Sequence, residues 1–345
     1  MAEPITELTD AGERPRVLVA GATGYTGALA ARLVDRHPGL ELVAVTARSQ
    51  VGERLGEIYP RHPVSLEIEE LDSQVIERAD AGIVAYPHGA AAPVVAEMRG
   101  LGLLVVDLSA DFRFLELPDY EKTYGDHSAP ELLDGAVYGL PELDRAAVAG
   151  AELVANPGCY PTAALLGLAP LVRAGLAEDV VIDAKSGTSG AGRDAGEAVS
   201  FVNVTENVRP YKPVGHRHRP EILERLSTLS PDGTTPSLTF VPHLLPVDQG
   251  ELVSAYVTTR DELPQEELYA LYRDAYEDEP FVDVVDSPPG VRDVRETNRC
   301  RIQAVAGEDR VLVFSVIDNL WKGASSQAVQ NLNLMLDLPE GEGLE

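Results

Sequence analysis

The sequence predicts an α/β protein in which a doubly wound parallel-sheet domain is joined to an α+β domain with a mostly antiparallel sheet. Short β-branched runs alternate with helix-forming runs in the first half, which is typical of a parallel sheet covered by helices. A glycine-rich turn separates the first strand from the first helix. After about residue 160, longer segments alternate apolar and polar residues, which favours antiparallel strands.

The chain opens with a βαβ unit. Residues 16–20 form an apolar, β-branched run, 28–36 are good helix formers that stop at Pro38-Gly39, and 40–46 return to a strand pattern. The same alternation continues. We expect a strand, a helix and a strand over 81–85, 90–99 and 103–108.

The second half begins with an apolar helix expected over 162–174. Period-2 alternation then predicts strands over 237–241, 252–259 and 310–317, and helical patterns cover 262–278 and 325–336. We expect a disordered acidic leader over 1–14. Residues 15–158 and 320–345 are expected to form the first domain, and 159–319 the second.

Composition excludes several functional classes. The 56 acidic residues outnumber the 28 basic ones, and the formal charge of −28 repels nucleic acid and anionic membranes. No apolar run approaches the ~18 residues of a membrane span. The acids in the first ten residues contradict a signal peptide, and two cysteines give no disulfide framework. We therefore expect a cytoplasmic protein. The scattered acidic residues, with only four lysines, indicate that this cytoplasm is rich in salt, as in a halophilic organism.

The glycine-rich turn predicts a dinucleotide site. Gly21, Gly24 and Gly27 follow a strand and open a helix, where close backbone approach and the helix N-terminus suit a pyrophosphate. In an NAD site an acidic residue lies about 20 residues past the loop. Arg48 and Ser49 stand there instead, and both can bind a 2′-phosphate, which favours NADP. The first domain is thus predicted to be of the Rossmann type.

Cys159 is the candidate nucleophile. It lies in a Pro- and Gly-rich turn just ahead of the apolar helix, where free backbone N–H groups lower a thiol pKa. Cys300 alternates with arginines in a strand pattern and is interpreted as a core residue.

Two histidines are candidate proton donors. His216 and His218 lie in what we expect to be a loop, and they project to one side if the segment is extended. Glu221 can orient one imidazole. His216 follows a flexible glycine and is the preferred donor, with His218 as the alternative. No third ligand has metal-site spacing, so we expect no metal.

Three other segments are polar or glycine-rich without resembling linkers. The first contains Arg113 at the end of a strand, and the last contains Asn319 between the final strand and the tail helix. The middle one, over 185–193, has a cation at each end, Lys185 and Arg193, and many backbone donors, which suits a phosphate or carboxylate. Each is also compatible with ordinary turn chemistry.

Taken together, the motifs resemble those of the N-acetyl-gamma-glutamyl-phosphate reductases of arginine biosynthesis, a branch of the semialdehyde dehydrogenase family. The stretches are GATGYTG, YPHGA, DLSADFR, VYGLPEL, NPGCYPTAA, KSGTSGAGR, HRHRPEI and DNLWKGAS, and they run from residue 21 to about 330. The resemblance implies an NADP-dependent oxidoreductase that acts on a small acyl phosphate as a homodimer or homotetramer. It also implies that residues 15–158 and 320–345 form the NADP-binding domain, and that 159–319 form the catalytic and dimerisation domain.

The resemblance also implies a role for each matching residue. Cys159 is implied as the nucleophile and the HRH segment as the source of the acid/base histidine. The implied cofactor contacts are Gly21, Thr23, Gly24, Tyr25, Thr26, Gly27, Arg48, Ser49, Ser186, Gly187 and Asn319. The implied substrate contacts are Arg113, Asn156, Lys185, Arg193, Tyr211 and Glu221.

The expected reaction passes through a thioacyl enzyme. The Cys159 thiolate displaces phosphate from the acyl phosphate, NADPH reduces the thioester, and a histidine protonates the oxygen before the semialdehyde leaves. Alternatives are a glutamyl or aminoadipyl phosphate held by a carrier protein, which Tyr160-Pro161 disfavours, and aspartate-semialdehyde dehydrogenase. Two other classes stay open: a non-catalytic NADP-binding regulator and a Cys–His hydrolase.

Overall fold

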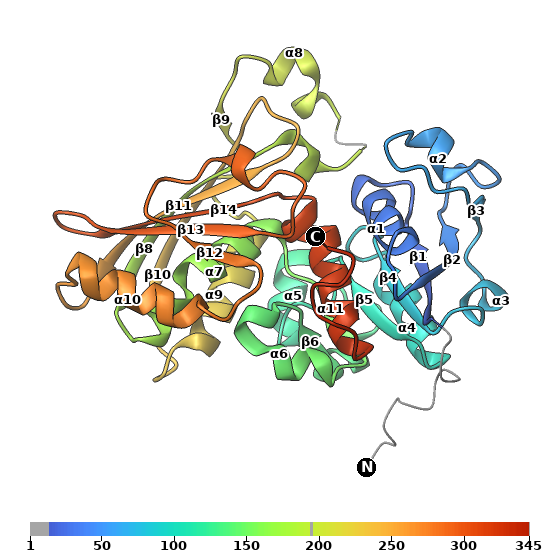
Figure 1. Cartoon of the computed structure of the whole chain (residues 1–345), viewed down its shortest axis with the longest axis horizontal. Coiled ribbons are helices and arrows are strands. Elements are labelled where there is room, and N and C mark those ends of the chain that lie inside the picture. The colour runs from blue at the N-terminus through green and yellow to red at the C-terminus, as the bar shows by residue number, and fades with distance from the viewer. Residues whose placement is uncertain (1–13, 194–195, 345) are drawn as a thin grey trace. The chain divides into compact units, whose positions relative to one another are not determined.

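The computed structural model describes residues 14–193 and 196–344, which divide into two compact units (Figure 1). One unit takes in the described residues up to Asn156 and from Ser325 onward, and the other is Pro157–Ala324. Each unit contains one seven-stranded sheet. In the described part of the chain, no helix is long and apolar enough to cross a membrane.

The sheet of the first unit is entirely parallel, as the alternating sequence pattern predicts. Its strand order is β3-β2-β1-β4-β5-β7-β6. The chain turns to one side of β1 for β2 and to the other side for β4, so the turn after β1 lies where a doubly wound sheet binds ligands. The strands are β1 (Arg16–Ala20), β2 (Glu41–Thr46), β3 (Ile68–Glu69), β4 (Ala81–Val84), β5 (Leu104–Asp107), β6 (Ala136–Tyr138) and β7 (Leu153–Ala155).

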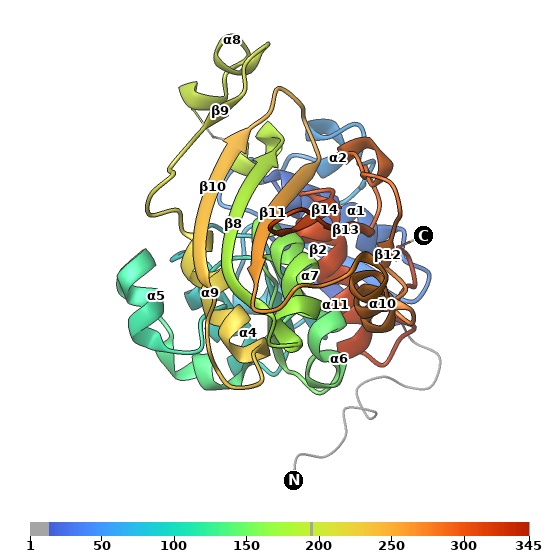
Figure 2. The ribbon, with the colours of Figure 1, turned by 90° about the vertical axis from the view of Figure 1, so that its left-hand side faces the viewer.

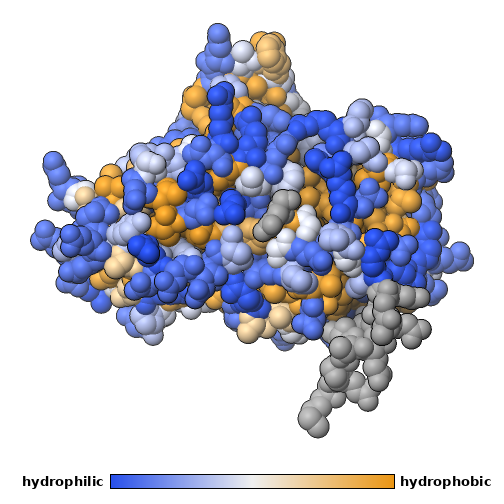
Figure 3. Space-filling model, viewed as in Figure 1, coloured by the Kyte–Doolittle hydropathy of each residue, from blue (hydrophilic) through white to orange (hydrophobic). Residues whose placement is uncertain are grey.

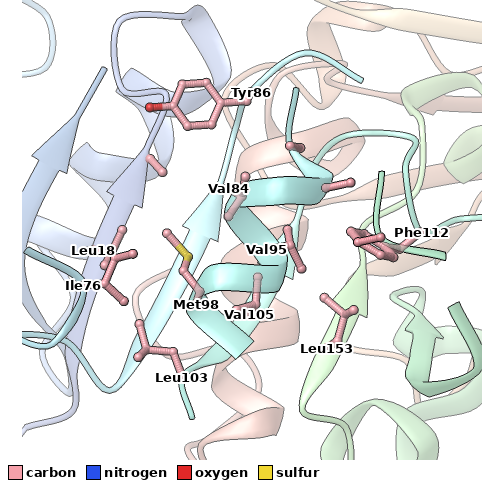
Figure 4. Packing of buried hydrophobic residues seen from close by; sticks show 14 of the residues in the cluster. Leu18, Ile76, Val84, Tyr86, Val95, Met98, Leu103, Val105, Phe112 and Leu153 are labelled. Carbon is pink, nitrogen blue, oxygen red and sulfur yellow. The ribbon is translucent and has the colours of Figure 1, made fainter. Parts of the chain in front are cut away.

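Helices accompany this sheet, and the tail helix belongs to the same unit. The helices are α1 (Tyr25–Asp35), α2 (Leu55–Ile58), α3 (Ser73–Ile76), α4 (Ala92–Gly100), α5 (Leu117–Tyr124), α6 (Pro141–Ala149) and α11 (Ser326–Met335). Leu18, Val84 and Val105 from three strands pack with Val95 and Met98 of α4 in a fully buried cluster (Figure 4). This packing fixes the strand ends and the turns that follow them.

The sheet of the second unit is mixed and mostly antiparallel, in the order β12-β13-β14-β11-β8-β10-β9. Two of its pairs, β8–β10 and β12–β13, are parallel. The strands are β8 (Ala177–Ser186), β9 (Arg209–Pro210), β10 (Ser237–Leu244), β11 (Glu251–Thr259), β12 (Val282–Val284), β13 (Cys300–Ala306) and β14 (Val311–Ile317). The expected fold class is confirmed for both sheets.

Helix α7 (Cys159–Arg173) is the buried helix of the second unit. It begins at Cys159, three residues earlier than the sequence predicted, because Pro161 is accommodated in its first turn. Two tyrosines of α10 (Gln265–Tyr276), Tyr272 and Tyr276, donate hydrogen bonds to backbone carbonyls of α7. The remaining helices are α8 (Phe201–Val204) and α9 (His218–Leu229).

The two faces of this sheet differ. Burial alternates along β8, where Val180, Ile182 and Ala184 are buried and the residues between them are partly exposed. The central strands β10, β8 and β11 stand side by side in Figure 2. Beyond β9, the segment around α8 projects, and Phe201 and Val202 are exposed there (Figure 3).

Candidate active site

Cys159 is the first residue of α7, and its side chain is partly exposed. The preceding Gly158 is extended, and no acidic residue lies in the first turn. The positive end of a 15-residue helix therefore acts on the sulfur, which favours a thiolate. Gly323 passes so close that a Cβ on it would lie 2.8 Å from the Cys159 Cβ, so any side chain there would displace the nucleophile.

Glu221 holds the turn that carries the nucleophile. Its Oε1 accepts a hydrogen bond of 3.0 Å from the backbone N–H of Gly158, and its side chain is fully buried. On the other side of the turn, the Gly158 carbonyl accepts from the N–H and hydroxyl of Thr162. The sequence suggested that Glu221 orients an imidazole or binds substrate. The structure gives it a contact that positions the turn before Cys159.

Glu251 is a buried carboxyl group beside Cys159 that sequence reasoning missed. It begins β11, is fully buried, and neither carboxyl oxygen meets the geometry of a hydrogen bond. Burial raises the pKa of Glu251 to about 8, the Cys159 thiol and Ser186 hydroxyl favour its charged form, and the Asp318 charge opposes it. Its alternation with Val253 and Ala255 was the signal that it points inward.

A cluster of aromatic rings lies beside the nucleophile. The Tyr211 hydroxyl donates to the Tyr160 hydroxyl at 3.3 Å, and burial raises the pKa of both phenols. The negative charge of a Cys159 thiolate raises the pKa of both phenols further, so both tyrosine side chains lie close enough to the sulfur to interact with its charge. The imidazole centroid of His216 is 5.5 Å from that of Tyr211 and 5.9 Å from that of Tyr160.

The two histidines are not in one extended loop, so that expectation is wrong. His218 opens α9, because Pro220 and Glu221 suit the first turn of a helix. The rings are 5.1 Å apart at 73°, and the backbone N–H of His218 donates to Nδ1 of His216 at 3.2 Å. Burial, followed by the charges of Arg217 and Lys212, lowers the pKa of His216 to about 4. His216 is therefore a neutral imidazole at neutral pH.

Asn319 joins two loops of the second unit. Its Oδ1 accepts from the N–H of Gly250 at 2.8 Å, and its amide donates to the Ser189 hydroxyl at 3.0 Å. Gly187, next to the buried Ser186, donates its N–H to the Gly250 carbonyl at 2.9 Å. These bonds fix the loop that follows β8 against the start of β11.

Lys185 and Arg193, the two cations at the ends of the segment over 185–193, lie in different local settings. Lys185 alternates with the buried Ser186, so it lies on the partly exposed face of the sheet, where its Nζ is 2.7 Å from an oxygen of Asp183. Arg193 is an exposed turn residue. The structure therefore places Lys185 on the opposite face of β8 from the Ser186 side chain that faces Glu251.

The glycine turn of the first unit fits a dinucleotide. Gly21 has a φ of +88°, and a Cβ on Gly27 would lie 2.2 Å from the Gly21 carbonyl oxygen, so both positions require glycine. A Cβ on Gly24 would meet only one atom within 4 Å, at 3.7 Å, which leaves open space at the helix start. Thr23 and Thr26 are fixed through their carbonyls, which accept hydrogen bonds from the hydroxyls of Tyr59 and Ser325.

The residues expected at the ribose lie at the end of β2. Arg48 is exposed, with its guanidinium 5.1 Å from the ring centroid of Tyr86, and Ser49 follows it. Tyr25, the first residue of α1, packs edge-on against Tyr59 with centroids 6.4 Å apart. A stacked, solvent-facing guanidinium beside a partly exposed turn is suited to a phosphate group.

Arg113 and Asn156, two of the predicted substrate contacts, lie together in the first unit. Arg113 donates from Nε to the carbonyl of Asn156 and from an Nη to the carbonyl of Leu108, each at 2.8 Å. The Asn156 side chain accepts from Asn331 at 3.0 Å. These bonds join the ends of β5 and β7. Among the described residues, no cluster of three or more potential metal ligands occurs.

Comparison with known families matches both units. Residues 16–151 match the semialdehyde dehydrogenase NAD binding domain, and residues 159–319 match the semialdehyde dehydrogenase dimerisation domain. A parallel sheet with a dinucleotide-type turn and a helix-start cysteine on a mixed sheet thus define a protein of the semialdehyde dehydrogenase class.

Similar proteins of known name show to which branch of the semialdehyde dehydrogenases the chain belongs. The chain is 48% identical over 341 residues to the N-acetyl-gamma-glutamyl-phosphate reductase of Desulforudis audaxviator, covering 95% of this chain and 97% of that protein. The enzymes of the same name from Moorella thermoacetica and Halorhodospira halophila are 47% and 46% identical with the same coverage. The chain belongs to the N-acetyl-gamma-glutamyl-phosphate reductase family.

Solved structures agree with the fold. Aspartate semialdehyde dehydrogenase II from Vibrio cholerae, complexed with ASA, superposes with a TM-score of 0.72 at 18% identity over 94% of this chain and 99% of that one. The Candida albicans aspartate semialdehyde dehydrogenase with NADP gives 0.63 at 14% identity, over 94% of this chain and 99% of that one. At these identities the likeness shows the fold.

Proposed function

We propose that the protein reduces N-acetyl-gamma-glutamyl phosphate to N-acetyl-glutamate 5-semialdehyde and phosphate with NADPH. The observation that carries this proposal is the placement of Cys159 at the positive end of α7 in a chain that is 44–48% identical to reductases of this name. The relatives support the free acetylated substrate over a carrier-bound or an aspartyl one.

Cys159 forms the covalent intermediate in this proposal. Its thiolate attacks the acyl carbon, the carbon–oxygen bond to phosphate breaks, and phosphate leaves with the electron pair. Glu221 keeps the Gly158 turn in place, so the sulfur stays at the helix end during acylation. The resulting thioester carbonyl is more electrophilic than a carboxylate and accepts a hydride.

The Gly21–Gly27 turn, Arg48 and Ser49 hold NADP(H) in this proposal. The open space at Gly24 and the helix N-terminus support a pyrophosphate there, and Arg48 supports the 2′-phosphate. When bound, the dihydronicotinamide supplies the hydride for the thioester. We expect Asn319 to act through the loop that it holds, since its amide already bonds Gly250 and Ser189.

His216 is the proposed hydrogen-bond donor to the oxygen that gains negative charge. Because Nδ1 accepts from the His218 backbone, the neutral ring carries its hydrogen on Nε2. That Nε2–H donates a hydrogen bond to the oxyanion that forms on reduction and stabilises its charge, and burial among Tyr160 and Tyr211 keeps water away from the ring. His218 is the alternative donor.

We propose a homodimer formed through the partly exposed face of the second sheet. Val181, Tyr256 and Leu312 are neighbours across β8, β11 and β14 and are all partly exposed. This apolar row lies within the segment that matches a dimerisation domain. A sedimentation measurement on the wild type and on Tyr256→Asp should show the dimer and its loss; a tetramer would require a second surface.

The large excess of acidic residues supports the proposal that the enzyme works in the cytoplasm of a salt-rich cell. A charge of −28 repels itself, and salt screens that repulsion. The melting temperature should therefore rise with KCl concentration. A melting temperature that does not change with salt contradicts this part of the proposal.

The reverse reaction tests the function. Wild-type enzyme should reduce NADP only when N-acetyl-glutamate 5-semialdehyde and phosphate are both present. Aspartate semialdehyde in its place should react far more slowly. Turnover without phosphate, or faster turnover of the aspartyl substrate, contradicts the assignment.

A further inference from the structure

Glu251 is a buried acid that the proposed mechanism does not use. It lies at the first position of β11, where its backbone pairs with Ser186 of β8 and Ile317 of β14. Its carboxyl oxygens have no hydrogen bond of good geometry, and the side chain is 0% exposed. Burying an ionisable carboxyl group without partners is costly, and a carboxyl group with a strongly perturbed pKa beside a candidate nucleophile is a candidate functional group.

The groups around Glu251 identify that use. Cys159 of α7 and Ser186 of β8 are the side chains close enough to stabilise its charged form, and Asp318 after β14 repels it. The phenols of Tyr160 and Tyr211 are also within its electrostatic reach. None of these groups carries a positive charge. A carboxylate here therefore receives no compensating positive charge from any of these groups, whereas a carboxylic acid needs none.

We propose that Glu251 is the proton partner of Cys159, so that thiol and carboxyl group share one proton. The inference rests on the proposed thioacyl mechanism. During acylation the thiol proton passes from Sγ to a Glu251 oxygen as the sulfur–carbon bond forms. Phosphate departs with the electron pair of the broken carbon–oxygen bond and is protonated by solvent. When the carbon–sulfur bond later breaks, the proton returns from Glu251 to the sulfur.

This pairing has a consequence for how the two groups titrate. Between the two steps the pair holds one proton, and part of the cysteine is thiolate there because Glu251 holds that proton. The second proton leaves only at higher pH, since two neighbouring negative charges repel each other. The pH profile of thiolate formation therefore has two steps, and both belong to the pair.

Alkylation by iodoacetamide measures this profile without substrate or cofactor. All proteins in the test carry Cys300→Ala, so Cys159 is the sole thiol. We expect two steps with Glu251 present. Glu251→Gln should give one step, with the alkaline limb moved down by at least about one pH unit, because the repelling charge is gone. Glu251→Asp should restore two steps.

A matched control separates the local pair from general surface charge. Glu178→Gln makes the same chemical change on β8, at an exposed residue that pairs with Arg260, and should keep the two-step profile. Profiles of the parent and Glu251→Gln that superimpose would overturn the proposal. The alkylation profile needs neither substrate nor cofactor, whereas the reverse assay measures NADP reduction. An enzyme that is active in the reverse assay but shows no effect of Glu251→Gln on alkylation would therefore overturn proton sharing alone.

Infrared spectroscopy gives an independent readout of the proton. The parent protein should show a protonated-carboxyl band at neutral pH that is absent in Glu251→Gln and titrates at a different pH in Cys159→Ala. Asp107 in the other unit is also fully buried with its pKa raised to about 7, so Asp107→Asn assigns the second band. A Glu251 band that does not respond to Cys159→Ala would overturn proton sharing.

Discussion

Replacing Glu251 by glutamine should make the second unit more stable, and by more at high pH than at low pH. Burial raises the pKa of Glu251 from 4.5 to about 8. Between those values the folded protein holds a proton that the unfolded chain has lost. The stability linked to this group is therefore fully present below pH 4.5 and is lost as the pH rises through about 8. A difference of about 3.5 pKa units corresponds to a few kcal/mol, at most about 5.

Trp321 provides the assay, because it is the single tryptophan and lies in the same unit as Glu251. Urea unfolding followed by its fluorescence gives the free energy of unfolding of both proteins at about pH 5 and about pH 9. Asp107 titrates in both proteins, so its contribution cancels in the comparison. The advantage of Glu251→Gln should grow by about 3–4 kcal/mol between the two pH values. An advantage independent of pH would refute the reasoning.

Three further predictions concern the proposed active site and cofactor site. Cys159→Ala should abolish turnover while NADPH still binds, measured by nicotinamide fluorescence, whereas Cys300→Ala should keep most activity. Arg48→Ala should weaken NADPH by about 1–3 kcal/mol and leave NADH almost unchanged, and an equal loss for both would exclude a 2′-phosphate contact. His216→Asn should lower kcat by about 10²–10⁴-fold. His218→Asn should mainly raise KM, and the reverse pattern would exchange the two roles.

The fold followed from the sequence wherever hydrophobic periodicity was strong. The predicted bounds of β1 agree with the structure, and those of β2 and β14 differ by one residue at the start. Strand β8 was not predicted, because Val181 on its partly exposed face is as apolar as the buried Val180 and Ile182, which hides the alternation. Along β8 the alternation of two residues is visible in which side chains are buried, but not in which residues are apolar.

The site was predictable in its residue types but only partly in its geometry. The helix-start setting of Cys159 could be read from Pro161 and the apolar run that follows. The role of Glu221 could not, since its contact with Gly158 joins residues 63 apart in the chain. Glu251 was accessible in principle, because it alternates in phase with buried apolar residues of β11. A charged residue at a core-facing position is a functional signal.

The most direct test of the account is the mass of the enzyme after reaction with N-acetyl-gamma-glutamyl phosphate in the absence of NADPH. The account predicts that the intact protein gains one N-acetylglutamyl group, that peptide mapping places it on Cys159, and that added NADPH removes it with release of the semialdehyde. Cys159→Ala should gain nothing. An adduct that survives in Cys159→Ala, or wild-type turnover with no adduct on Cys159, would contradict the thioacyl mechanism.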